Sequence, residues 1–126
     1  MRYLWPLPIT LFGAVLGIVV MTFGGTFRRE GIALEGSGGP AADILWLFNP
    51  RGRIDAITLG HVIIARDAAV AHALRSHEQA HVRQYERCGL VFPLVYLAAG
   101  AWARMHGGCA YRDNRFEREA RAAAAR

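Results

Sequence analysis

The residues His77-Glu78-Gln79-Ala80-His81 read H-E-x-x-H, a spacing that can perform metal chemistry. Two histidines four residues apart on a helix lie on the same face, so both imidazoles can reach one zinc ion at about 2.0–2.1 Å. Glu78 is offset by one position, where its carboxylate can take a proton from a zinc-activated water. The motif therefore predicts two metal ligands, His77 and His81, and a general base, Glu78.

A catalytic zinc site usually has three protein ligands and keeps a further position open for water. The candidates for the third ligand downstream of the motif are Asp113, Glu117 and Glu119. Asn114 is a good helix N-cap, and an acid three residues later completes a capping-box pattern. Glu117 therefore has two interpretations, as a structural cap or as a metal ligand.

The motif followed by Glu117-Arg118-Glu119-Ala120 resembles the gluzincin arrangement, H-E-x-x-H and then E-x-x-A. The chain is similar in this respect to membrane-linked peptidases of the HtpX type and to small bacterial zincin-like domains of unknown function. The resemblance covers roughly residues 54–121 and implies that Glu117 is the third zinc ligand. The family has an aspartate four residues after that glutamate, where it orients a zinc-bound histidine, and this chain has Arg121. Glu119 or a backbone carbonyl is a possible replacement.

Three further histidines are not expected to bind the metal. His61 belongs to a turn or to the surface, and His72 is not three or four residues from His77. His106, together with Tyr111, lies in a stretch that could supply a hydrogen-bond donor to the developing oxyanion.

The remaining pattern predicts a mostly helical α+β fold that holds the metal helix rigidly. Asp67 can cap a long helix that runs to about Cys88, with Gly89 after its end. Before it, the β-branched stretch Ile54–Ala65 predicts a strand or a tight hairpin. After it, residues 90–103 predict an apolar helix, and residues 111–126 predict the helix that carries the third ligand. Since 14 residues are short for a membrane span, the apolar helix must fold back if Glu117 is to reach the histidines.

Tyr3 to Phe23 contain no charged side chain, and about 20 such residues can cross a bilayer as a helix. We therefore expect a transmembrane anchor over residues 1–27, with a cleaved signal peptide as the alternative. Arg28 and Arg29 follow it and favour a cytoplasmic domain by the positive-inside rule, against Arg2 on the other side. Residues 28–53 are expected to be a linker and an apolar connecting segment, with flexible E-G-S-G-G-P at its centre. Residues 54–126 are expected to form the zincin-like domain.

Composition supports contact with a membrane and argues against nucleic-acid binding. The chain is 53% hydrophobic. Its net charge is +5 because fifteen arginines, with no lysine, outnumber ten acidic residues. Arginines of this kind suit a solvated face or anionic lipid heads, and no basic module with interleaved aromatics indicates nucleic-acid binding. Cys88 and Cys109 are too far apart along a helix to pair, so we expect free thiols.

The leading hypothesis is a membrane-anchored zinc metallopeptidase, in which His77, His81 and Glu117 hold Zn²⁺ and Glu78 activates water to attack a peptide or protein substrate. The alternative is a zincin-like membrane scaffold or regulator that binds zinc with little or no turnover. A third possibility is a small membrane protein without metal.

Overall fold

The computed structural model describes residues 3–50 and 54–126, so Arg2 and the end of the connecting segment expected over residues 28–53 lie outside the described residues. The fold is α+β and mostly helical, as predicted. Its elements in chain order are α1 (Leu7–Thr22), β1 (Thr26–Glu30), β2 (Ala33–Ser37), α2 (Ala41–Phe48), β3 (Ala56–Leu59), β4 (Val62–Ala65), α3 (Ala68–Cys88), the short 3₁₀ helix η1 (Gly89–Val91), α4 (Phe92–Met105) and α5 (Arg115–Ala124).

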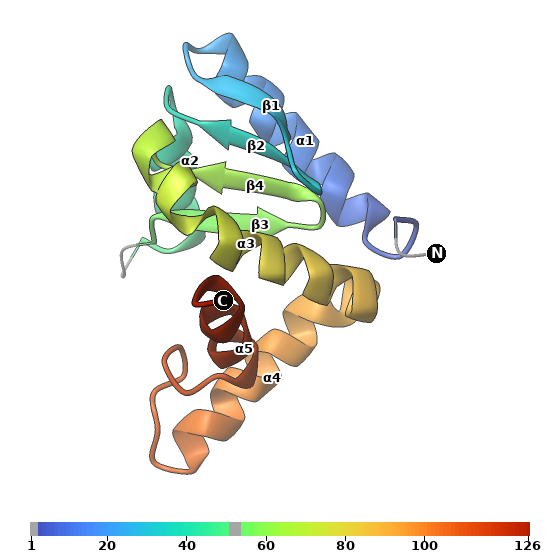
Figure 1. Ribbon diagram of the computed structural model, residues 1–126, viewed down its shortest axis with the longest axis vertical. Helices are drawn as coiled ribbons and strands as arrows, with labels where there is room; N and C mark the ends of the chain where they lie inside the picture. The colour runs from blue at the N-terminus through green and yellow to red at the C-terminus, as the bar shows by residue number, and fades with distance from the viewer. Residues whose placement is uncertain (1–2, 51–53) are drawn as a thin grey trace.

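A four-stranded sheet in the order β1-β2-β4-β3 forms the middle layer. The β1–β2 and β3–β4 pairs are antiparallel, whereas β2 and β4 run parallel. Helices α1 and α2 cover one face of the sheet and α3 covers the other, while α4 and α5 lie beyond α3 (Figure 1). The metal helix is therefore supported by the sheet on one side and by two further helices on the other.

The strand β4 shows how alternation builds these layers. Successive side chains of a strand point to opposite faces. Val62 and Ile64 accordingly pack with α1 and α2, and Ile63 packs with Val82 of α3. The β3–β4 pairing places Thr58 opposite Ile63, and thus on the face that carries α3. The hairpin predicted from the β-branched residues is confirmed, with its turn at Gly60.

Helix α1 is part of the folded domain. Gly13 and Gly17 lie against the sheet, where an added Cβ would come within 2.8 Å of Val62 and 2.3 Å of the Phe27 ring. These glycines let the helix approach the strands closely. At 16 residues, α1 is about 24 Å long, shorter than the roughly 30 Å of a bilayer core. The N-terminal span expected over residues 1–27 is thus not confirmed.

Another segment does pass the test of length and composition for a membrane span. Helices α3, η1 and α4 form one helical run, Ala68–Met105, that contains a sufficiently apolar window. Both ends of this run belong to the same folded unit, because α3 and α4 each pack against α5. The fold-back of the apolar segment at 90–103, which the site hypothesis required, is therefore present.

The expected linker over residues 28–53 differs from the structure. Its first part contains β1 and β2, and Glu35, Gly36 and Ser37 of the glycine-rich stretch are buried in the sheet. Gly36 is closely packed there, since an added Cβ would lie 3.1 Å from the Ile64 side chain. The apolar run Ile44–Phe48, within the expected connecting segment, belongs to helix α2. Residues 28–50 therefore belong to the same folded unit as residues 54–126.

The helix boundaries around the site follow the predicted capping chemistry. The Asp67 side chain accepts a hydrogen bond from Val70 N at 2.8 Å and begins α3, and Gly89 ends it with a positive φ of 65°. Asn114 likewise caps α5, because its Oδ1 accepts from Phe116 N at 2.9 Å. Both cysteines are free thiols, as expected.

Candidate metal centre

His77, His81 and Glu117 form a group that can hold a metal ion, since one potential ligand atom from each lies within 4.8 Å of the others. The Glu117 carboxylate lies between the rings, 3.0 Å from His77 Nε2 and 3.2 Å from His81 Nε2. Ligands about 2.0–2.1 Å from a tetrahedral zinc ion are roughly 3.3 Å apart, so these separations fit one ion with little movement. Glu117 therefore turns towards the two histidines rather than back to its own N-cap.

The protonation states at this group reflect a competition between proton and metal. Burial alone would raise the pKa of Glu117, but its hydrogen bonds with His77 and His81 outweigh burial and hold that pKa well below its ordinary value. Burial opposes the charged form of His81, whereas Glu117 and Glu78 favour it, and the net pKa of His81 is raised. A proton and a cation would therefore compete for the position between the imidazoles and the carboxylate.

Gln84 fixes the orientation of His81. It is fully buried, and its Oε1 accepts a hydrogen bond from His81 Nδ1 at 2.8 Å. Its Nε2 donates to the Phe116 carbonyl at 3.0 Å, which determines which way the amide faces. With Nδ1 protonated, Nε2 of His81 faces the metal position. Gln84, rather than the residue at position 121, is therefore the side chain that orients His81.

Two further side chains support the group: Tyr96 in the apolar segment, which the sequence analysis did not single out, and Asn114, which it predicted only as a helix cap. The Tyr96 hydroxyl donates to Glu117 Oε1 at 2.6 Å. Burial and the Glu117 carboxylate raise the pKa of Tyr96, which keeps it protonated as a donor. Asn114 donates from Nδ2 to the Tyr96 carbonyl at 2.9 Å and so joins the cap of α5 to α4. The sequence did hold a signal for Tyr96, because its hydroxyl is a polar group within an otherwise apolar helix.

The expected general base, Glu78, is buried on α3 beside the group. Thr58 of β3 donates to Glu78 Oε2 at 2.7 Å. This hydrogen bond connects the hairpin to the carboxylate and restricts its rotation. Tyr111, a candidate oxyanion donor, also lies near: burial and the Glu117 carboxylate raise its pKa to about 12, so its hydroxyl keeps its proton at neutral pH.

Several other sequence candidates lie outside the group. Asp113 accepts from the Cys109 backbone N at 2.6 Å, and Glu119 pairs with Arg87 on the surface at 2.5 Å. Neither is a ligand, and Glu119 does not orient a histidine. His61 occupies the predicted turn but is buried, with its Nε2 2.9 Å from Glu86 Oε1.

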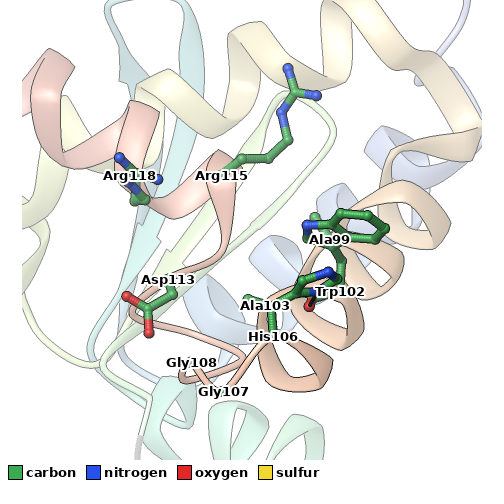
Figure 2. Close-up of a pocket in the computed structure, with 9 residues that line it drawn as sticks. All are labelled: Ala99, Trp102, Ala103, His106, Gly107, Gly108, Asp113, Arg115 and Arg118. Carbon is green, nitrogen blue, oxygen red and sulfur yellow. Dashed lines mark hydrogen bonds between the residues drawn. The ribbon is translucent and has the colours of Figure 1, made fainter.

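His106 is also separated from the candidate ligands. It borders a hollow of about 610 Å³ formed by the end of α4, the following loop and the first turn of α5 (Figure 2). Its ring stacks on Trp102 with 4.1 Å between the centroids, and none of the three candidate ligands lines this hollow. His106 is therefore poorly placed to donate to an oxyanion at the candidate metal centre.

No family model, curated protein or solved structure matches this chain. The gluzincin resemblance therefore depends on the motif residues alone. The structure adds that His77 and His81 lie beside Glu117, which follows His81 by 36 positions in the sequence.

Proposed function

We propose that this protein is a membrane-attached zinc metallopeptidase. The observation that supports it most is the placement of Glu117 against both histidines of the H-E-x-x-H helix, at 3.0 and 3.2 Å. Two imidazoles and one carboxylate form a donor set suited to a catalytic zinc with an open position. The buried Glu78 on the same helix supplies a carboxylate of the kind that general-base chemistry requires.

In this proposal each side chain has a distinct role. Bound zinc would lower the pKa of a water towards about 7 and polarise a carbonyl group. Glu78 takes a proton from the attacking water and delivers it to the amine that leaves when the peptide C–N bond breaks. Thr58 holds the Glu78 carboxylate in place, and Gln84 holds the ring of His81. Tyr111 donates a hydrogen bond to the carbonyl oxygen as it becomes negative.

The second candidate is the metal-binding scaffold or regulator without turnover. Its specific support is the low exposure of the group, since Glu117 is 3% exposed and Glu78 and His81 are each 7% exposed. An extended peptide needs wider access than this, so hydrolysis requires α5 or the loop before it to move. Binding of an ion requires no such opening.

The test compares zinc content and peptide hydrolysis in four forms of the full-length protein. The parent should bind about one zinc and hydrolyse members of a fluorogenic peptide library. Glu78→Gln should keep zinc and lose hydrolysis, whereas His77→Ala should lose both. The matched control is His72→Ala, which changes an exposed histidine on the same helix and should keep both.

Zinc binding without hydrolysis in the parent, across the library and with lipid vesicles present, would support the scaffold instead. Failure of the parent to bind zinc would remove both candidates.

Membrane attachment is supported by the uncharged segment from Tyr3 to Phe23 and by the apolar window within Ala68–Met105. The single N-terminal span and the cytoplasmic placement of the domain remain predictions from sequence. Peptides and proteins near the membrane are the proposed substrates.

A further inference from the structure

All three tryptophans of the chain are on the surface, with exposed fractions of 54% for Trp5, 61% for Trp46 and 66% for Trp102. Tryptophan is normally among the more buried residues of a soluble domain. At a membrane surface, however, its ring lies at the level of the lipid head groups and is enriched there. Trp5 precedes α1, Trp46 lies within α2, and Trp102 lies near the end of α4.

Exposed aliphatic and aromatic side chains connect these positions, and we call them together the apolar face. On α1 the exposed residues follow helical spacing along the side opposite the sheet, and on α4 they lie opposite Phe92 and Tyr96. The members are Leu4, Trp5, Leu7, Leu11, Phe12, Val15, Ile18, Trp46, Leu47, Phe48, Leu90, Val91, Leu94, Leu97, Trp102 and Met105.

Contacts between the helices make the apolar face continuous. The rings of Phe12 on α1 and Phe48 on α2 are 6.4 Å apart. At the other end of α1, Trp5 lies so close to Gly89 that an added Cβ would be 2.8 Å from it. The start of the chain therefore lies beside the junction of α3 and α4, from which α1 and α4 diverge (Figure 1).

We infer that the apolar face binds a bilayer that contains anionic lipid and lies in its interfacial layer, with α1, α2 and η1–α4 each partly inserted and none crossing it. This inference rests on the membrane attachment proposed above, but not on the peptidase chemistry.

The inner sides of the same helices argue against a crossing. Arg28, Arg29 and Glu30 belong to β1, the strand that turns back and packs beside α1. Tyr96 of α4 contacts the Glu117 carboxylate on its inner side. If either helix crossed the hydrocarbon, these charged groups would lie at membrane depth, where they are costly. A helix with one apolar side and one side packed on polar protein is suited to the interface.

Charge and extent favour lipid over a second copy of the chain. The net charge of +5 attracts anionic head groups, whereas it repels an identical molecule. The apolar face also extends over α1, α2 and η1–α4, a breadth that suits a lipid surface.

The test measures flotation of the full-length Glu78→Gln protein with phosphatidylcholine vesicles, with and without phosphatidylglycerol. This background separates binding from hydrolysis. We expect binding that is stronger with the anionic lipid, a blue shift of tryptophan emission, and quenching by lipids brominated near the head group. Leu94→Glu with Leu97→Glu, at positions 68% and 66% exposed, should weaken binding at least about tenfold without lowering the unfolding temperature.

The matched control introduces the same two charges away from the apolar face, as Ile32→Glu with His72→Glu, and should leave binding within about twofold. Two results would overturn the inference. In the first, both the parent and the Leu94/Leu97 variant remain in the vesicles after carbonate extraction, which would indicate that α1 spans the bilayer. The second is a parent protein that ignores vesicles and forms a dimer that the same variant dissociates.

Discussion

Replacing Gln84 with leucine tests whether this side chain prepares His81 for the metal. Gln84 is fully buried and uses its amide twice, to accept from His81 Nδ1 at 2.8 Å and to donate to the Phe116 carbonyl at 3.0 Å. Leucine has a similar volume but removes both hydrogen bonds. Each loss costs about 1–3 kcal/mol, so we expect the free energy of unfolding to fall by roughly 2–6 kcal/mol.

The same substitution should weaken zinc binding. With no acceptor at Nδ1, His81 is free to change tautomer and to rotate its ring away from the cation. Loss of a group that orients a metal-bound histidine typically lowers affinity by about 10–100-fold. Competition with a chromophoric chelator measures this affinity, and urea unfolding monitored by circular dichroism measures stability on the same samples.

A second variant separates the two effects. Gln84→Glu keeps an acceptor for His81 but removes the donor to Phe116, so it should lose stability while its zinc affinity remains within about threefold of the parent. The reasoning is refuted if Gln84→Leu folds and binds zinc as tightly as the parent protein. It is also refuted if both variants lose affinity equally, because stability alone would then explain the change.

Three other changes have definite expected outcomes. Thr58→Val removes the hydrogen bond to Glu78, and it should leave zinc content unchanged while peptide hydrolysis falls about tenfold, as measured by initial rates. Gly17→Ala places a methyl group against an aromatic ring of β1 and should lower stability by about 1–3 kcal/mol in thermal unfolding; an unchanged midpoint would contradict the close packing of α1. In zinc-free protein the lowered pKa of Glu117 contributes stability above about pH 4.3, and the raised pKa of His81 contributes stability that is present below about pH 6.5 and is lost as pH rises through the raised value. Urea titrations of the zinc-free form should therefore show this contribution at its largest between about pH 4.3 and about pH 6.5. Zinc affinity should decline as the pH falls below the pKa of free histidine.

Local chemistry made much of the metal helix predictable. Asp67 and Gly89 mark its ends through capping, and the H-E-x-x-H spacing places both histidines on one face. The hairpin before it follows from β-branched residues on either side of Gly60. These features depend on residues close together in the chain, and sequence patterns report such features well.

The parts that sequence reasoning missed depend on contacts between distant residues. Glycines at 36, 38 and 39 have the composition of a linker, but Gly36 serves the close packing of the sheet on α1, 19 residues earlier at Gly17. The run Ile44–Phe48 is too short for its period to distinguish a helix from a strand. The position of Gln84, three residues after His81 and thus on the same side of the helix, was visible in the sequence, but its hydrogen bond to the Phe116 carbonyl, 32 residues later, was not.

The tail helix is held near the candidate metal centre largely by polar groups: Gln84 binds the Phe116 backbone, Tyr96 binds the Glu117 carboxylate, and Asn114 binds the α4 backbone. During synthesis a chain translated only through α4 already contains both imidazoles but lacks the acid that completes the donor set. Capture of an ion by all three ligands must therefore wait until residue 117 has emerged and docked. In the proposed metal site, coordination by all three groups therefore follows the docking of α5 and cannot precede it.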